Sequence, residues 1–403
     1  MKLKLTVLLL LFITLTNAQS WQLSQDAEIS VLTIGPGSSV IDAFGHSAFR
    51  VKDKTQHLDT VFNYGSYDFD TPNFYLKFAR GKLNYKLAAN SYSAFFEFYI
   101  AQNRTVEEQL LNLTQVQKQR LFDFLLNNAK PENKYYLYDF FYDNCATRIK
   151  DVANNALNKT IAFNTPQDFN PKTFRQLIHS HLNQNSWGSL GIDIALGSVI
   201  DKKATAEEHM FLPKFIYPFF ENATFSDSGT ALVKQSKVLF KKIDKPTATS
   251  FMSSPLMVFG IIGFFILWIT YRDYKNHKRS QWLDMTLFAL TGVTGVLLLL
   301  LWFATDHSAT ANNYNLLWAF PINLLVFGQI IKKSPKPWLV KYLKFLVILF
   351  SLLTLHWILG VQVFAIGLLP LFIAIFIRYV YLIKYYTKEL IAKDTFRIPV
   401  FTL

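Results

Sequence analysis

Five long apolar stretches fill the C-terminal part of the chain and alternate with short polar connections. Each approaches the roughly 20 residues that a membrane-spanning helix needs. The pattern predicts an all-α bundle of five transmembrane helices within residues 255–403. The stretches cover roughly residues 255–271, 282–303, 313–331, 342–359 and 362–384.

The polar connections between these stretches differ in charge. Residues 272–281 and 332–341 are rich in Lys and Arg, as is the tail after residue 384, whereas residues 304–312 and the turn at Gly360 carry none. Because basic loops stay in the cytoplasm, this predicts a cytoplasmic C-terminus and an exported domain before the first span. The tight turn at Gly360 leaves open a hairpin of the last two stretches that does not cross fully.

Three residues of the predicted spans carry an expectation of their own. Pro321 and Pro370 are expected to kink their helices, because proline removes a backbone hydrogen bond. Arg378 is expected to extend its side chain toward the cytoplasmic face.

The N-terminus carries an export signal. Lys2 and Lys4 precede an apolar run over residues 5–15, and Thr16-Asn17-Ala18 supplies small residues for cleavage. We predict a signal peptide over residues 1–18. An uncleaved anchor helix is the alternative, although the apolar run is short for a span.

The exported part begins with strand-like segments. Residues 28–34, 45–52 and 59–64 mix β-branched and aromatic residues between turn signals. Thr114 with Gln117 resembles a capping box, which predicts a helix through about residue 128.

A second helix is expected to start at Cys145, because Asp143 and Asn144 are capping residue types. Strands followed by helices predict an α+β domain over residues 19–222. The polar stretch 223–254 is expected to be a juxtamembrane linker.

The formal net charge of +13 does not point to nucleic acid. Residues 19–254 contain 25 Lys and Arg against 23 Asp and Glu, whereas residues 255–403 contain 14 against 5. The excess therefore lies beside the predicted spans, where it reports topology.

Cys145 is the only cysteine of the chain. In an exported protein it has no intramolecular disulfide partner, and at the start of a helix its thiolate would be stabilised. His46 lies on a predicted strand, and a histidine with a cysteine is the minimal pair for thioester chemistry. The alternatives are a buried core thiol, which the polar neighbours Asn144 and Arg148 disfavour, and a strand histidine that only packs against aromatic rings.

The order of the pair, histidine before cysteine, resembles the circularly permuted branch of the NlpC/P60 papain-like superfamily. A closer resemblance, to the Lnb periplasmic-domain family of Bacteroidota, covers nearly the whole chain. The runs that carry it are residues 45–51, 62–69, 72–83, 142–148 and 305–310.

The Lnb resemblance implies a circularly permuted papain-like domain in the periplasm and a multi-pass protein of the bacterial inner membrane. It implies an acyltransferase that moves an acyl chain from phospholipid, through a thioester on Cys145, to the α-amino group of a diacylated lipoprotein. His46 would be the base. The resemblance does not fix the orienting group, for which Asn63 and Tyr64, on the next strand, are the candidates. No metal or organic cofactor is implied.

Asp306 and His307, in a predicted outer loop, would approach this site, bind lipid headgroups or cap the third span. The aromatic residues of 62–99 would line an acyl groove or form ordinary core.

Two other functions stay open. A cell-wall amidase or cysteine peptidase of the NlpC/P60 kind would cleave muropeptides and would not need a polytopic region. A non-catalytic lipid-binding receptor or transport component would keep its function when Cys145 is replaced.

Overall fold

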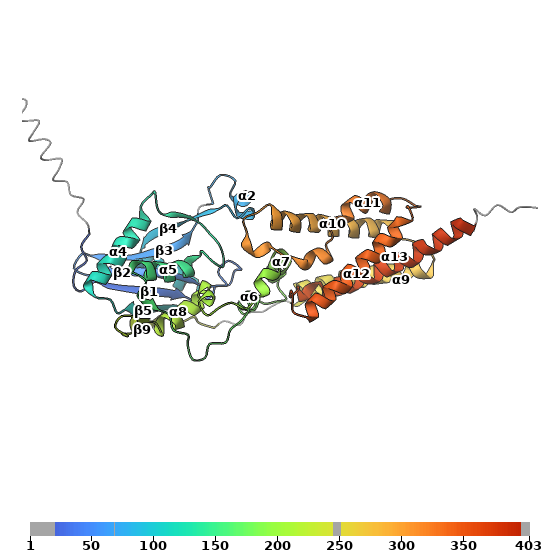
Figure 1. The fold of residues 1–403 in the computed structure, drawn as a ribbon. Coiled ribbons are helices and arrows are strands. Elements are labelled where there is room, and N and C mark those ends of the chain that lie inside the picture. Colours follow the sequence, from blue (N-terminus) through green and yellow to red (C-terminus); the bar gives the residue numbers. More distant parts are fainter. Residues whose placement is uncertain (1–20, 68, 245–250, 396–403) are drawn as a thin grey trace, which may run out of the picture.

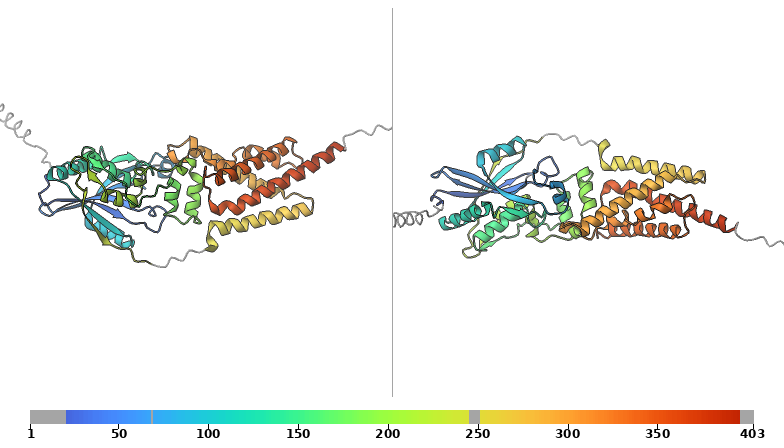
Figure 2. Two further views of the ribbon diagram at one scale, coloured as in Figure 1. Left: turned by 60° about the horizontal axis from the view of Figure 1, so that its bottom comes forward. Right: turned by 90° about the horizontal axis from the view of Figure 1, so that it is seen from above.

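The computed structural model describes residues 21–67, 69–244 and 251–395, so the predicted signal peptide lies outside the described residues. A sheet-containing domain lies at one end of the molecule, and a bundle of long helices extends from it (Figure 1 and Figure 2).

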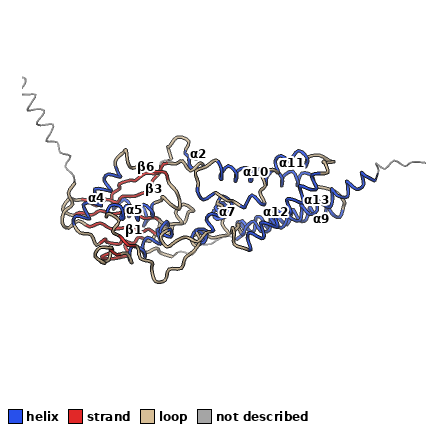
Figure 3. The backbone as a smooth tube through the Cα atoms, viewed as in Figure 1, coloured by secondary structure: helices blue, strands red, loops and turns tan. Residues whose placement is uncertain are grey.

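The first domain is built around an antiparallel sheet of seven strands in the order β6-β4-β3-β2-β1-β5-β9 (Figure 3). The three strands predicted from the sequence are present within two residues of their expected ends. The strands are β1 (Glu28–Ile34), β2 (His46–Asp53), β3 (Leu58–Ser66), β4 (Asn84–Ser91), β5 (Val106–Leu111), β6 (Tyr135–Leu137) and β9 (Val233–Phe240). A separate pair joins β7 (Ile161–Ala162) and β8 (Thr224–Phe225).

Strand β9 corrects the prediction of a linker over residues 223–254. Val233–Phe240 pairs with β5 and forms one edge of the sheet. None of its side chains is buried and half are exposed, as is common for an edge strand, so its polar sequence resembles that of a linker.

Helices cover both faces of the sheet. Helix α3 (Tyr92–Ala101) packs on the face that carries Ala48 and Val61. Helices α4 (Gln115–Ala129), α5 (Cys145–Ala156) and α8 (Pro213–Glu221) pack on the face that carries Phe49 and Phe62. Neighbouring residues of β2 and β3 thus alternate between two cores, as the strand period requires. The predicted α+β class and the starts of α4 and α5 are confirmed.

The second domain contains four helices that are long and apolar enough to cross a membrane, counted over the described residues. They are α9 (Pro255–Lys275), α10 (Gln281–Phe303), α12 (Trp338–Ile358) and α13 (Leu369–Thr395). Five spanning helices are therefore not confirmed. Because α12 and α13 each have spanning length, the structure does not favour a partial hairpin at Gly360.

The predicted third span, 313–331, is broken into the 3₁₀ turn η5 (Tyr314–Leu317) and the short helix α11 (Asn323–Ile330). Pro321 lies between them, where it cannot continue a helix. The irregular backbone packs closely on α10, since a Cβ on Gly295 would lie 2.1 Å from the Ala319 carbonyl oxygen. Non-helical backbone is tolerated at membrane depth where protein surrounds it in this way.

Two predictions about single residues of the bundle are wrong. Pro370 lies in the first turn of α13, where no hydrogen bond is lost, so it does not kink the helix. Arg378 is fully buried, and its guanidinium donates to the carboxylates of Asp284 and Asp273, with both donor–acceptor distances at 2.7 Å. A charge at membrane depth is stabilised by such pairing, and its two partners lie about 100 positions away in the sequence.

The two domains are joined through α6 (Phe174–His179), α7 (Trp187–Ala195) and the 3₁₀ turn η1 (Ser198–Asp201) (Figure 1). Asn313 donates to the carbonyl oxygens of Ile194 (2.8 Å) and Ala195 (3.1 Å). Backbone hydrogen bonds join Gly197 to Ala309 and Ser198 to Asn312. The contact between the domains is therefore made largely by backbone groups of fixed geometry.

Candidate active site

Cys145 is the first residue of α5, and Asn144 fixes the start of that helix. The Asn144 side-chain oxygen accepts from the backbone N–H groups of Ala146 (2.8 Å) and Thr147 (3.0 Å). Asn144 is itself buried, and its amide nitrogen donates to the carbonyl oxygens of Phe140 and Phe211. The two bonds of the cap go to the residues that follow Cys145, so the cap does not engage the N–H of Cys145 itself.

His46 is the first residue of β2, and Asn63 on the neighbouring strand β3 contacts its ring. The His46 Nε2 atom lies 2.5 Å from the Asn63 side-chain oxygen. Because an amide oxygen only accepts, Nε2 carries a proton, and Nδ1 is the ring nitrogen left for the thiol. The ring also stacks on Tyr99 of α3, with centroids 6.1 Å apart.

The Cys145 and His46 side chains are hydrogen-bonded to each other, and each changes the ionisation of its partner. Burial raises the pKa of the Cys145 thiol, but the His46 charge, its hydrogen bond and the N–H groups of Ser47 and Ala146 together hold that pKa below its usual value. Burial lowers the pKa of His46, but Cys145 and Asn63 together raise it above its usual value. Both shifts favour a thiolate and an imidazolium.

A small space lies over this pair, beside Gly65 of β3. Gly65 has a φ of +91°, and a Cβ placed on it would lie 3.6 Å from Cys145 Cβ and 3.8 Å from His46 Cε1. The Tyr136 hydroxyl is 4.0 Å from the same point. A carbon-sized group therefore fits where a cysteine, a histidine and a tyrosine hydroxyl converge.

Tyr136 was not identified from the sequence. Its hydroxyl is buried beside the backbone N–H of Gly65 and, within the described part of the chain, donates no hydrogen bond of its own. Burial raises its pKa, and a charged Cys145 adds to the rise, so the hydroxyl keeps its proton. The ring packs under Arg148, whose guanidinium carbon lies 4.2 Å from the ring centroid. Arg148 is in turn paired with Asp143 through both carboxylate oxygens.

Tyr64, the alternative orienting residue, does not contact His46 in the described structure. It follows Asn63 on β3 and therefore points to the opposite face of the sheet, where it is buried. Its hydroxyl accepts from Asn128, and its ring makes an edge contact with Tyr136. Of the two candidates, only Asn63 is placed against the histidine.

Asp306 and His307 follow α10 and contact the end of helix α2 (Phe74–Ala79), not Cys145 or His46. The Asp306 N–H donates to the Arg80 carbonyl oxygen (2.9 Å), and His307 Nε2 lies 2.9 Å from the Phe78 carbonyl oxygen. The next residue, Ser308, donates to Asp139 in the turn that precedes Cys145 (3.0 Å). This loop therefore links the membrane domain to the end of α2 and to the turn that precedes Cys145.

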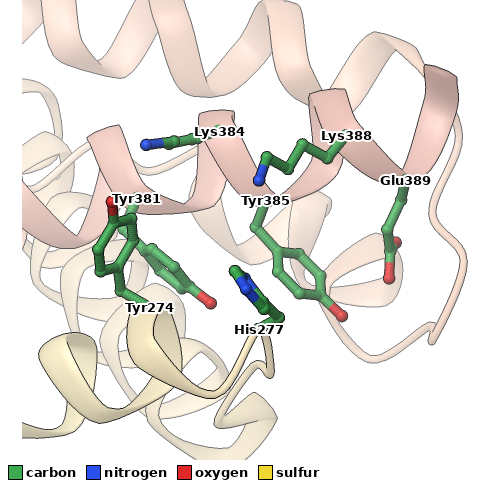
Figure 4. A pocket seen from close by; sticks show the side chains of 7 residues that line it. All are labelled: Tyr274, His277, Tyr381, Lys384, Tyr385, Lys388 and Glu389. Atoms are coloured by element: carbon green, nitrogen blue, oxygen red, sulfur yellow. The ribbon is translucent and has the colours of Figure 1, made fainter. Parts of the chain in front are cut away.

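Two further observations concern the rest of the molecule. Over the described ranges, no group of three or more His, Cys, Asp or Glu side chains could hold a metal ion. A cavity of about 340 Å³ lies between the ends of α9 and α13 remote from the sheet domain (Figure 4). Its lining is of the aromatic and charged types that gather at membrane surfaces: Tyr274, His277, Tyr381, Lys384, Tyr385, Lys388 and Glu389.

Comparison with protein families identifies both parts of the chain. Residues 19–180 match the Lnb N-terminal periplasmic domain, and residues 247–389 match the Lnb transmembrane domain. The chain belongs to the Lnb family. No curated protein and no solved structure matches it. Membership of the Lnb family makes this a membrane protein with a periplasmic part, and the periplasmic match contains the residues that surround Cys145.

Proposed function

We propose that this Lnb protein is a lipoprotein N-acyltransferase that works through a thioester on Cys145. The observation that supports it best is the hydrogen-bonded series Cys145–His46–Asn63, held at the start of a helix in a domain fixed to membrane helices. Cysteine nucleophiles are activated by a histidine that a third group orients. Both substrates of such a reaction are lipids, which explains why the series is joined to a membrane domain.

In the first half-reaction, the Cys145 thiolate attacks an ester carbonyl carbon of a phospholipid. The helix N-terminus, with the Cys145 N–H that the Asn144 cap does not engage, and the Tyr136 hydroxyl would stabilise the oxyanion. The carbon–oxygen ester bond then breaks, and His46 gives its Nδ1 proton to the departing alkoxide. The products are a lysophospholipid and an acyl thioester.

In the second half-reaction, the α-amino group of a diacylglyceryl-cysteine attacks the thioester carbonyl carbon. His46 takes a proton from the attacking nitrogen, the carbon–sulfur bond breaks, and the thiolate is restored with an amide as product. No step requires an oxidant or a cofactor.

We place the protein in the bacterial inner membrane, with a periplasmic permuted papain-like domain ahead of the membrane domain. We also propose that the broken segment 313–331 is a fifth crossing, which makes the C-terminus cytoplasmic. Asn313 at one end contacts the periplasmic domain, and at the other end Arg279, in a basic loop, donates to the Ile330 carbonyl oxygen.

The test is to incubate the purified full-length protein with labelled phospholipid and no acceptor. We expect a hydroxylamine-sensitive adduct that is absent from Cys145→Ala and that passes to the α-amino group when diacylated lipopeptide is added. Discharge only to free fatty acid would make the protein a phospholipase. Cleavage of muropeptides would favour the amidase alternative, and full biological activity of Cys145→Ala without any adduct would favour the receptor alternative.

A further inference from the structure

Helix α2 and the residues around it form an exposed apolar segment beside the membrane domain. No residue of α2 is buried, and Tyr75 and Leu76 are 80% and 56% exposed. Phe69 and Phe78 are also exposed. Clustered apolar side chains of this kind mark an interaction surface, because single exposed apolar residues are ordinary but a contiguous set is not.

The position of α2 indicates what covers this surface. Its C-terminal end is bonded to Asp306 and His307, in the loop that follows the membrane helix α10, so α2 lies level with the outer end of the spans (Figure 1). Lys77, Arg80 and Lys82 lie in or next to α2. Aromatic and basic residues at this depth are the types that bind the interfacial layer of a bilayer, where anionic headgroups attract the cations.

A continuous row of ring contacts runs inward from α2. Tyr75 contacts Phe74, Phe74 contacts Tyr67, and Tyr67 contacts Tyr85, with centroids 5.4, 5.9 and 5.3 Å apart. Tyr85 stacks on Tyr138 at 4.2 Å.

The inner end of this row lies at the candidate active site. Asp139, next to Tyr138, exchanges two backbone hydrogen bonds with Asp143, which brings Tyr138 alongside the start of α5. The rings have open space beside them, because a cavity of about 210 Å³ borders the row at Tyr67. That cavity is lined by Tyr67, Thr71, Asn84, Lys86 and Tyr135.

We propose that α2 lies in the outer leaflet of the bilayer and that the aromatic row from Tyr75 to Tyr138 guides a phospholipid acyl chain from the leaflet to Cys145. This inference rests on the proposed function for the identity of the reacting lipid. The position of α2 in the leaflet does not depend on it.

The position of α2 in the leaflet is tested first. Because Cys145 is the only cysteine of the chain, its replacement leaves a protein in which one introduced cysteine can be labelled alone. In a full-length Cys145→Ser background, a single cysteine replaces Leu76 and carries a bimane label. The matched control is a single cysteine in place of Val116, which is 68% exposed. Val116 belongs to α4, a helix that lies on the side of the sheet domain away from the bundle (Figure 1).

In vesicles of phosphatidylethanolamine and phosphatidylglycerol, nitroxide-labelled lipid should quench the label at position 76, and iodide in the water should quench it weakly. The label at position 116 should show the opposite pattern. Equal quenching patterns at the two positions would overturn the inference.

The path is tested with Leu76→Glu in the protein that retains Cys145, because Leu76 supports no core and its replacement leaves the fold intact. Withdrawing this side chain from the leaflet should slow acyl loading from vesicles by about tenfold. Loading from a monomeric short-chain phospholipid and the rate of thiol alkylation should not change. Val116→Glu, the matched control, should alter none of these rates.

The outcomes separate the two proposals. If the unaltered protein forms no acyl adduct with any lipid, the proposed function fails, whatever the label at position 76 reports. If the adduct forms normally but Leu76→Glu loads from vesicles at the full rate, the lipid path is wrong and the acyltransferase proposal stands.

Discussion

Replacement of Asn63 by alanine tests whether a hydrogen-bonded series, and not a bare cysteine, supports the reaction. The Asn63 side-chain oxygen lies 2.5 Å from His46 Nε2, and it faces a ring that is positively charged in the thiolate–imidazolium pair that starts the reaction. A hydrogen bond to a charged group contributes about 1.5–3 kcal/mol. If that energy is lost from the transition state, acyl loading should slow by roughly 10- to 150-fold.

The assay is the initial rate of thioester formation on the full-length protein, with Tyr64→Phe as the matched control. Tyr64 is the next residue on the same strand, but its hydroxyl bonds to Asn128 on the opposite face of the sheet. Tyr64→Phe should therefore load at nearly the unaltered rate. The reasoning is refuted if Asn63→Ala loads at the full rate, or if Tyr64→Phe costs as much as Asn63→Ala.

Three further predictions follow from the same geometry and from the charge pattern. The pKa of Cys145 is lowered and that of His46 raised, so alkylation of the thiol should reach half its maximal rate below the ordinary thiol value of about 8.5, and His46→Ala should move this midpoint upward. A midpoint at or above 8.5 in the unaltered protein would exclude an activated thiol. Tyr136→Phe should slow acyl loading by about 100-fold, as loss of an oxyanion donor does, and leave alkylation unchanged; a parallel loss of alkylation would indicate a structural role instead. Reporters fused near residue 276 should read cytoplasmic and those near 308 periplasmic, and a periplasmic signal at 276 would overturn the topology.

Local signals in the sequence were sufficient for part of the site. Asn144 before Cys145 is a capping residue, and the helix begins where that signal placed it. The alternating residues around His46 gave its strand. A histidine on a strand and a cysteine at the start of a helix are each recognisable within a few positions, and the structure brings the two together.

The remaining features depend on contacts between distant parts of the chain. Tyr136 lies on a strand of three residues, too short for a periodic pattern, although the three tyrosines within residues 135–138 are a signal that draws attention to it. The sequence predicts a cytoplasmic position for Arg378, because its partners, Asp273 and Asp284, lie on other helices and no local pattern reveals them. The strand Val233–Phe240 is defined by its pairing with β5, which a polar sequence does not reveal.

The bonds between Asn313 and the backbone of α7 have a consequence for substrate choice. Two carbonyl oxygens, of Ile194 and Ala195, are held by one side chain, and adjacent backbone bonds reinforce them, so the sheet domain has little freedom to rise or tilt. These contacts then fix the height of Cys145 above the membrane surface. Under the proposed function, this fixed height selects an acceptor by how near the bilayer its reactive end lies, and the sequence that follows that end is free to vary.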